Sequence, residues 1–169
     1  MHAPINSTVR YTLGVMAQSV SAAVQYAGGL IFDRAAAGWD VTVYTEDDAC
    51  SIAIEILGAK CRDLESLLHA YASFPTVLVV TASLHAENRR VGAYVAAASA
   101  IGAADVMLTG LGGPDDAAAG GGFLYSLGSA ASAFKRCAVQ AGDLQIETVG
   151  GSEHFRRLAA RIGAENPVG

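Results

Sequence analysis

Apolar and polar positions along the chain follow two periods, one typical of strands and the other of helices. The stretch Thr76–Pro114 shows both: an apolar run TVLVVT, a polar elbow ASLHAEN, a helical run RRVGAYVAAASAIGA, a second apolar run DVMLTG and a glycine-rich turn. Two parallel strands need a crossover of about a dozen residues or more, and the segment between the apolar runs has that length. This stretch therefore predicts one strand, helix, strand unit.

The same pattern extends toward the N-terminus. Val9–Met16 alternates well enough for a strand, although it would also suit the opening of the helix that follows. Apolar residues at helical spacing from Ser19 to Ala37 predict a long helix that ends at Gly38. Asp40–Thr45 is rich in β-branched residues and predicts another strand.

Two adjacent glycines, Gly28 and Gly29, lie in the middle of the predicted long helix. Each weakens a helix by roughly 1 kcal/mol relative to Ala. We therefore expect a close contact with another helix or with the sheet at this point.

Further strands and helices are expected on both sides of the opening unit. They are a short helix over Ile52–Leu57, a helix capped by Asp63 and stopped by Pro75, a helix over Phe123–Gln140, a strand over Leu144–Val149 and a last helix capped by Ser152. Strands and helices thus alternate throughout, which favours a single α/β domain over residues 1–169 in which residues 1–8 form a loose arm.

Composition limits the partners of such a domain. Apolar residues make up 52% of the chain, which suits helices packed on a doubly covered sheet or a subunit interface, so we expect a homo-oligomer. No apolar run approaches the roughly 20 residues of a membrane helix. The net charge of -5 makes nucleic acid an unlikely partner and argues against an anionic membrane.

The compartment is predicted from the N-terminal segment and the cysteines. The first 20 residues lack the basic and apolar pattern of a secretory signal, which predicts a cytoplasmic protein. Cys50, Cys61 and Cys137 are scattered and fit neither a disulfide framework nor a metal-binding pair. We expect them to be small buried side chains.

Three loops follow strands and are the expected ligand-binding positions, because ligands bind open parallel sheets beyond the carboxyl ends of the strands. These loops are Thr45–Asp48, Thr81–Asn88 and Gly110–Asp116. The candidate ligand-binding residues in them are Glu46, Asp47, Thr81, Ser83, His85, Gly110, Gly112, Gly113 and Asp115. The alternative interpretation is that each loop is only a polar connection.

The glycine-rich loop approaches a dinucleotide-binding motif without completing it. Gly110, Gly112 and Gly113 suit G-x-G-x-x-G in part, but Asp115 occupies the third glycine position. A carboxylate there would repel a pyrophosphate, so the sequence favours a flexible turn.

The other two loops contain groups that suit a metal or a nucleophile. Glu46, Asp47 and Asp48 would suit Mg²⁺, although a solvated turn that caps the next helix is favoured. Ser83 and His85, with Asp115, formally supply a nucleophile, a base and an acid. The motif G-x-S-x-G is absent, so no catalytic residue, metal or cofactor is assigned.

Two arginines, Arg89 and Arg90, begin the helix after the polar elbow, where cations oppose the helix dipole. An anionic ligand or an acidic neighbour would account for them. With Lys135, Arg136, Arg156, Arg157 and Arg161 they would form a basic face, although solvated helix surfaces are the favoured interpretation.

The order of the predicted elements resembles the nucleotide-binding core of RecA-like proteins. That order is a long helix, a strand with an acidic run, a helix ending in ILGA, and then strand, helix, strand and glycine-rich loop. The resemblance covers Ser19–Phe134 at the level of element order. The P-loop is missing, because Leu13–Ser19 reads LGVMAQS without lysine, and a strand expected to end in a metal-binding Asp ends in Thr81. The resemblance therefore implies a degenerate, non-hydrolysing relative that acts through protein contacts, with no functional residue carried over.

The sequence as a whole predicts a three-layer Rossmann-like or RecA-like α/β domain with a mostly parallel sheet of about four to five strands between helices. The favoured function is a small cytoplasmic binding or regulatory module, non-catalytic and self-associating, with a protein partner and no membrane partner. One alternative is a small-molecule or nucleotide-binding enzyme with its site at the carboxyl ends of the strands. Another is a degenerate RecA-like protein that lacks the P-loop.

Overall fold

Seven strands form one mixed sheet in the part of the chain that the computed structural model describes, residues 9–47, 51–69, 73–111, 122–146 and 148–158. The strands are β1 (Thr12–Ala17), β2 (Asp40–Thr45), β3 (Lys60–Asp63), β4 (Val77–Thr81), β5 (Asp105–Thr109), β6 (Gly122–Ser126) and β7 (Ser152–Arg157). Their order across the sheet is β3-β2-β1-β4-β5-β7-β6. The first five run parallel, whereas β7 is antiparallel to both of its neighbours.

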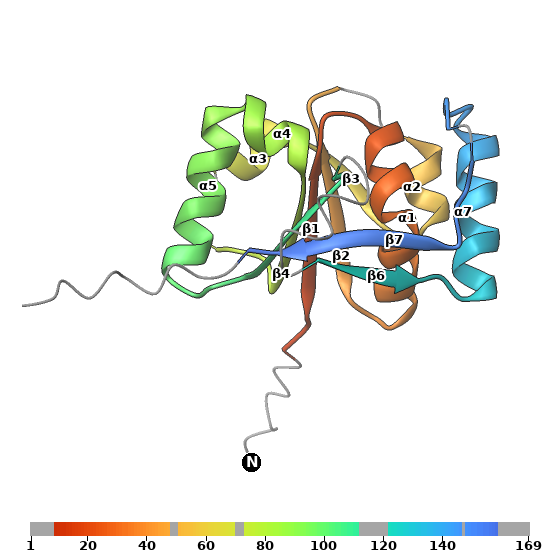
Figure 1. Cartoon of the computed structure of the whole chain (residues 1–169), viewed down its shortest axis with the longest axis horizontal. Coiled ribbons are helices and arrows are strands. Elements are labelled where there is room, and N and C mark those ends of the chain that lie inside the picture. The colour runs from red at the N-terminus through yellow and green to blue at the C-terminus, as the bar shows by residue number, and fades with distance from the viewer. Residues whose placement is uncertain (1–8, 48–50, 70–72, 112–121, 147, 159–169) are drawn as a thin grey trace, which may run out of the picture.

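Helices cover both faces of this sheet (Figure 1). One side carries α1 (Val20–Ala36), α2 (Ile52–Ile56) and α7 (Ser129–Ala141), and the other carries α3 (Leu64–Leu68), α4 (Ala82–Glu87) and α5 (Arg89–Ala100). Two separate clusters of buried apolar side chains correspond to the two faces. The architecture is therefore an α/β fold of three layers.

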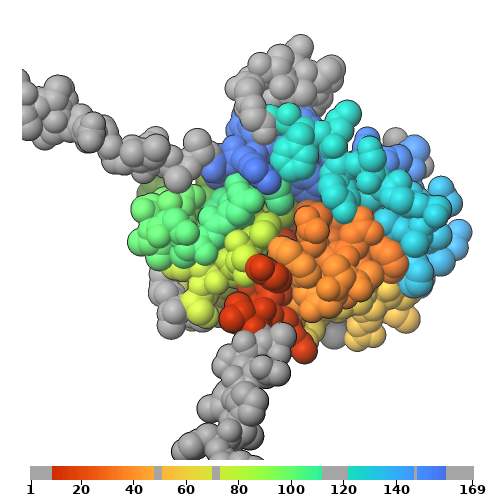
Figure 2. All heavy atoms as spheres, turned by 90° about the horizontal axis from the view of Figure 1, so that it is seen from below, coloured from red at the N-terminus to blue at the C-terminus, as the bar shows by residue number. Residues whose placement is uncertain are grey.

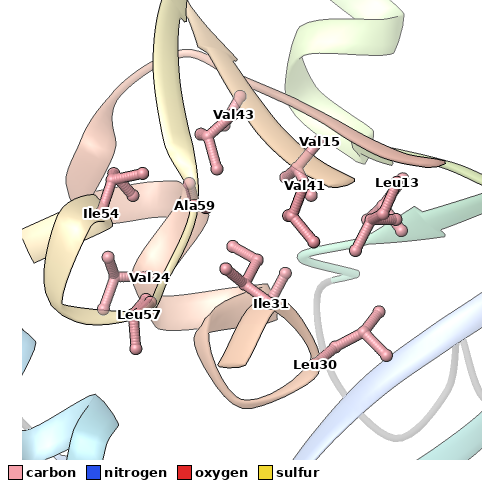
Figure 3. Close-up of a cluster of buried hydrophobic side chains, with 14 of the residues drawn as sticks. Leu13, Val15, Val24, Leu30, Ile31, Val41, Val43, Ile54, Leu57 and Ala59 are labelled. Carbon is pink, nitrogen blue, oxygen red and sulfur yellow. The ribbon is translucent and has the colours of Figure 1, made fainter. Parts of the chain in front are cut away.

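Strand β1 separates the two clusters, because successive side chains of a strand point to opposite faces of the sheet. Val15 belongs to the cluster on the α1 side and Met16 to the cluster on the α5 side, and both are fully buried. Figure 3 shows the α1 side, where Val15 and Val43 of the sheet lie with Val24 and Ile31 of the helix. Burying one such side chain stabilises the fold by about 1.5–3 kcal/mol.

Several local signals in the sequence act as predicted. The Ser19 hydroxyl accepts a hydrogen bond from Ala22 N–H at 3.1 Å and so caps α1, and Gly38 ends that segment with a φ of +88°. The Asp63 carboxylate caps α3 by accepting from Glu65 N–H at 3.2 Å. Strand β2 has the predicted bounds, and the predicted strand, helix, strand unit is present as β4, α5 and β5.

Three predictions for the C-terminal third are wrong. The expected helix over Phe123–Gln140 begins as a strand, β6, and only its later part is helical, as α7. Leu144–Val149 is not a strand; its described residues form an irregular segment. Ser152 does not cap a helix but begins β7, so the described part of the expected last helix is a strand.

The sheet also has more strands than the four to five expected, since β3, β6 and β7 were not foreseen as strands. The polar elbow after β4 is not a plain loop, because most of it forms α4. Within the described residues, no helix is long and apolar enough to cross a membrane.

Candidate functional site

The chain order of the sheet reverses between β1 and β4, and the segments that leave their carboxyl ends meet there. The Gln18 amide, directly after β1, connects the two strands. Its Oε1 accepts a hydrogen bond from the buried Thr81 hydroxyl at 2.8 Å, and its Nε2 donates to the Ser83 hydroxyl oxygen. Because the Ser83 oxygen accepts this bond, the Ser83 proton is directed to another acceptor.

A second polar contact joins the end of β2 to the start of α5. Glu46 is exposed after β2, and its Oε1 accepts a hydrogen bond from the Asn88 side chain at 3.2 Å. The Asn88 Oδ1 also accepts from Arg90 N–H at 3.0 Å and Val91 N–H at 3.2 Å, which caps α5. One side chain therefore caps the helix and orients the Glu46 carboxylate.

An open cavity of about 510 Å³ lies at this contact. It is lined by Glu46, Leu84, Glu87, Asn88, Arg89 and Arg90, so it combines two carboxylates with two guanidinium groups. Its volume is within the range of small-molecule sites. We call this cavity, lined by these six residues, the Glu46 cavity.

The two arginines of the Glu46 cavity have different surroundings. Arg90 donates through Nη1 to both carboxylate oxygens of Glu65, at 2.7 and 2.9 Å. This pair is about half exposed and therefore adds little to stability. Arg89 has no ion-pair partner among the described residues, so its guanidinium is available to an anion.

His85, another predicted site residue, lines a different cavity. That cavity has a volume of about 510 Å³ and lies along α5, with Gly92, Val95, Ser99 and Leu158 among its walls. No described hydrogen bond joins His85 to Ser83. The predicted serine and histidine are thus close in sequence but are not placed as a nucleophile and its base.

The third predicted loop is described only at its start. Gly110 has a φ of +70°, and a Cβ there would lie 3.1 Å from the Tyr26 ring, so glycine is required for both conformation and space. Gly112, Gly113 and Asp115 lie outside the described residues, as does Asp48. Asp47 has an exposed side chain, and its carbonyl accepts from the Thr45 hydroxyl at 2.9 Å.

A buried ion pair that the sequence analysis did not single out lies on the α1 side of the sheet. Lys135 Nζ of α7 donates to Glu153 Oε2 of β7 at 2.8 Å, and their side chains are 3% and 0% exposed. The same carboxylate accepts from Gly29 N–H at 2.8 Å and from Leu30 N–H at 2.9 Å. Burial raises the pKa of Glu153, and Lys135 and the two N–H groups counter part of this effect.

Two carbonyls of α1 next to this pair also have side-chain partners. Gln25 C=O accepts from Lys135 Nζ at 2.7 Å, and Tyr26 C=O accepts from the Thr109 hydroxyl at 3.2 Å. In a regular helix these two carbonyls would bond the N–H groups of Gly29 and Leu30. All four backbone groups have side-chain partners from other elements, and the Gly28-Gly29 pair was the one sequence signal of this close packing.

No group of three or more His, Cys, Asp or Glu residues in the described part of the chain is arranged to hold a metal ion. The acidic run predicted to suit Mg²⁺ is only partly described, because Asp48 lies outside the described residues. Magnesium binding by Glu46, Asp47 and Asp48 together therefore stays a prediction.

Comparison with known proteins gives the fold but no family. No model of a protein family matches the sequence, and no curated protein matches it. A deacetylase of the teicoplanin biosynthesis pathway, solved with teicoplanin, has a TM-score of 0.65 and 12% identity, over 88% of this chain and 98% of that one. The A40926 pseudoaglycone deacetylase Dbv21 also has a TM-score of 0.65 and 12% identity, over 90% and 98%.

A third similar structure has a different activity. It is GalB, the 4-carboxy-2-hydroxymuconate hydratase of Pseudomonas putida KT2440, with a TM-score of 0.62, 14% identity and coverage of 90% of this chain and 98% of that one. At these identities the likeness establishes a shared fold alone.

These comparisons overturn the favoured prediction of a non-catalytic regulatory module. The three similar structures named above are enzymes, two deacetylases and a hydratase, and the fold is therefore one on which catalysis is built. The expectation of an enzyme with its site at the carboxyl ends of the strands agrees better with them. None of the three is a RecA-like protein, so the sequence resemblance to that family gains no support from them.

Proposed function

We propose that this protein is a small enzyme that adds water to a small anionic substrate bound in the Glu46 cavity. The observation that carries the proposal is the position of this cavity, because it lies at the carboxyl ends of the parallel strands and contains both carboxylates and a guanidinium group, that of Arg89, with no ion-pair partner in the described part of the chain. Deacetylation and hydration, the reactions named for the similar structures, both consume a water molecule.

Glu46 is the proposed general base. Its carboxylate is exposed to solvent, where a substrate water can reach it, and the hydrogen bond from Asn88 holds one oxygen in place. The second oxygen, Oε2, then accepts the proton of the attacking water. A positioned general base accelerates such a step by about 10²–10⁴-fold.

Arg89 is the proposed anchor of the substrate. A guanidinium group has five N–H donors in a planar fork that suits a carboxylate or a phosphate. Arg90 is occupied by Glu65, so Arg89 is the arginine that is available for this contact. The substrate class that follows is a small molecule with one anionic group and an electrophilic carbon.

Gln18, Thr81 and Ser83 are proposed to form the neighbouring wall of the site. Their hydrogen-bonded arrangement fixes the orientation of the Ser83 hydroxyl at the point where the sheet order reverses. A fixed hydroxyl donor of this kind stabilises the negative charge that develops on an oxygen when water attacks a carbonyl carbon.

The test is a turnover screen with two panels of small anionic compounds. N- and O-acetylated acids are followed by proton NMR for released acetate, and α,β-unsaturated dicarboxylates by the loss of their conjugated absorbance. With a substrate that is turned over, Glu46→Gln should lower kcat by about 10²–10⁴-fold. Arg89→Gln should raise KM by about tenfold or more, since hydrogen bonds to charged groups contribute about 1.5–3 kcal/mol.

Matched controls are the exposed residues Glu55 of α2 and Arg62 of β3, changed to Gln in the same way. Neither lines the Glu46 cavity, so both variants should retain the wild-type kcat and KM. The proposal fails if Glu46→Gln and the Glu55→Gln control have the same kcat, or if the wild type converts neither panel.

A further inference from the structure

A smaller cavity lies at the opposite end of the sheet from the Glu46 cavity. It has a volume of about 120 Å³ and opens between the start of the parallel strands, the C-terminal half of α1 and the β6–β7 pair. Figure 2 views the molecule from this end, with the red start of β1 beside the orange α1–β2 segment and with β6 and β7 above them. We call it the amino-end cavity.

The interior of the amino-end cavity is apolar. Leu13 and Phe155 are at most 2% exposed, and Leu30 and Met107 complete the apolar wall. An engineered apolar cavity of about 150 Å³ is known to bind benzene. A volume of 120 Å³ therefore suits an apolar group of about the size of one aromatic ring or slightly smaller.

The rim of the cavity is polar and carries an excess of positive charge. Arg34, Arg157 and Asp105 line it, which gives two cations and one anion. Arg157 Nη2 lies 3.7 Å from Asp105 Oδ2, a long and exposed ion pair. Asp33, the nearest further carboxylate on α1, accepts a hydrogen bond from Tyr125.

Arg34 is the cation that lacks a carboxylate partner among the described residues. Its guanidinium lies over the Trp39 ring, with Cζ 4.9 Å from the ring centroid. Stacking on a ring occupies the face of the guanidinium and leaves the N–H groups at its edge for hydrogen bonds in the plane. Arg34 is therefore held in a fixed position at the mouth of an apolar cavity.

We propose that the amino-end cavity is a binding site for a small carboxylate with a compact apolar tail, distinct from the proposed active site. The tail fills the space against Leu30 and Phe155, and the carboxylate receives hydrogen bonds from Arg34 at the rim. A neutral ligand of the same shape leaves the positive charge of Arg34 without a partner. The negative charge of the ligand therefore determines which ligands bind tightly.

Binding is tested with benzoate and its neutral isostere benzamide on the full chain. Titrations are followed by isothermal calorimetry and by two-dimensional amide NMR, which also locates the residues that respond. Benzoate should shift signals of β6, β7 and the C-terminal half of α1, and benzamide should bind at least about tenfold more weakly, because it lacks the charge that pairs with Arg34.

Two variants separate the charge from the cavity. Arg34→Gln should weaken benzoate binding about tenfold or more while leaving benzamide binding unchanged. Val77→Phe places a ring into the cavity from a half-buried position and should abolish binding of both compounds without removing a charge. Amide NMR spectra of the free variants confirm that each is folded.

The Arg62→Gln control, away from the cavity, should bind benzoate as the wild type does. Arg89→Gln and Glu46→Gln should also leave it unchanged, which keeps this proposal separate from the proposed active site. Equal affinity for benzoate and benzamide, the absence of saturable binding, or unchanged binding in folded Arg34→Gln and Val77→Phe would each overturn the proposal.

Discussion

At the level of single residues, the Tyr125 hydroxyl shows how a contact between distant elements affects ionisation. It donates to Asp33 Oδ2 of α1 from strand β6. Burial raises the pKa of Tyr125, the hydrogen bond to Asp33 raises it further, and the value is about 12. Arg34 acts in the opposite direction and Glu153 in the same direction, so the charged groups around the ring do not cancel the effect of burial.

A pH dependence of stability follows from this shift. The ordinary pKa of 10.0 applies to the unfolded chain, so between pH 10 and about 12 the unfolded chain loses a proton that the folded one keeps. The contribution of Tyr125 is thus complete below pH 10 and is lost as the pH rises through about 12. The unfolding free energy of the wild type should fall across this window relative to Tyr125→Phe.

Urea unfolding at a series of alkaline pH values measures this difference. Tyr11→Phe, at an exposed position, is the control, and its unfolding free energy should fall in parallel with that of the wild type. A constant difference between wild type and Tyr125→Phe from pH 9 to pH 12 would contradict the assignment of the raised pKa.

Part of the candidate site was predictable residue by residue. Glu46, Thr81 and Ser83 were candidates because each lies at or just after the end of an apolar strand, and such positions meet at one edge of a parallel sheet. Gln18 was missed, although it follows β1, because that strand was placed with less certain bounds. The Lys135–Glu153 pair was missed because its partners on α1 are more than a hundred positions away from Glu153 in sequence.

At the level of elements, the middle of α1 packs as its glycines indicated. A Cβ on Gly29 would overlap Leu127 Cδ2, whereas a Cβ on Gly28 would lie 3.3 Å from the nearest atom, Lys135 Cγ. Leu127 comes from the segment that leads into α7, so α1 and that segment approach closely at Gly29.

The two glycines should therefore respond differently to alanine. Gly29→Ala forces Leu127 to move and should lower the unfolding free energy, against a gain in helix propensity of roughly 1 kcal/mol. Gly28→Ala should cost less, since its neighbour is a flexible lysine stem. Thermal and urea unfolding compare the two.

A double variant isolates the cause. Leu127→Ala removes the atoms that a Cβ on Gly29 would meet, so the effect of Gly29→Ala should be smaller in that background than in the wild type. If Gly29→Ala costs the same in both backgrounds, contact with Leu127 is not the reason for the glycine.

The C-terminal elements show why a periodic pattern can mislead. Strand β7 reads SEHFRR, and its buried positions are Glu153 and Phe155. A carboxylate that faces the core interrupts the apolar alternation that would otherwise indicate a strand. Phe123 and Leu124 were likewise assigned to a helix, because their spacing to later apolar residues suits a helical period, yet β6 is an exposed edge strand.

At the level of the whole molecule, four of the five parallel strands were predictable, whereas the parallel edge strand β3 and the antiparallel strands were not. The parallel strands β1 to β4 are each followed by a helix, which is a local signal. The insertion of β7 between β5 and β6 is a long-range choice of partners that no local pattern encodes. The strand number was underestimated for this reason.

Backbone protection should follow the strand order. Amides of β1 and β4 lie in the centre of the sheet and should exchange most slowly with deuterium, and those of the edge strands β3 and β6 most rapidly. Hydrogen exchange followed by NMR at low protein concentration measures this gradient. Protection of β6 equal to that of β4 would contradict it, and would indicate that a second chain covers this edge.

The hydrogen bonds from the middle of α1 to Glu153 have a consequence for the order in which the chain folds. Its Gly29 and Leu30 amides are satisfied by Glu153, at sequence separations of 124 and 123. The first long helix can therefore reach its final hydrogen bonding only after the last strand has paired with the sheet. A chain that ends before Glu153 would lack the carboxylate that accepts from these two donors, so we expect α1 and the last described strand to fold cooperatively.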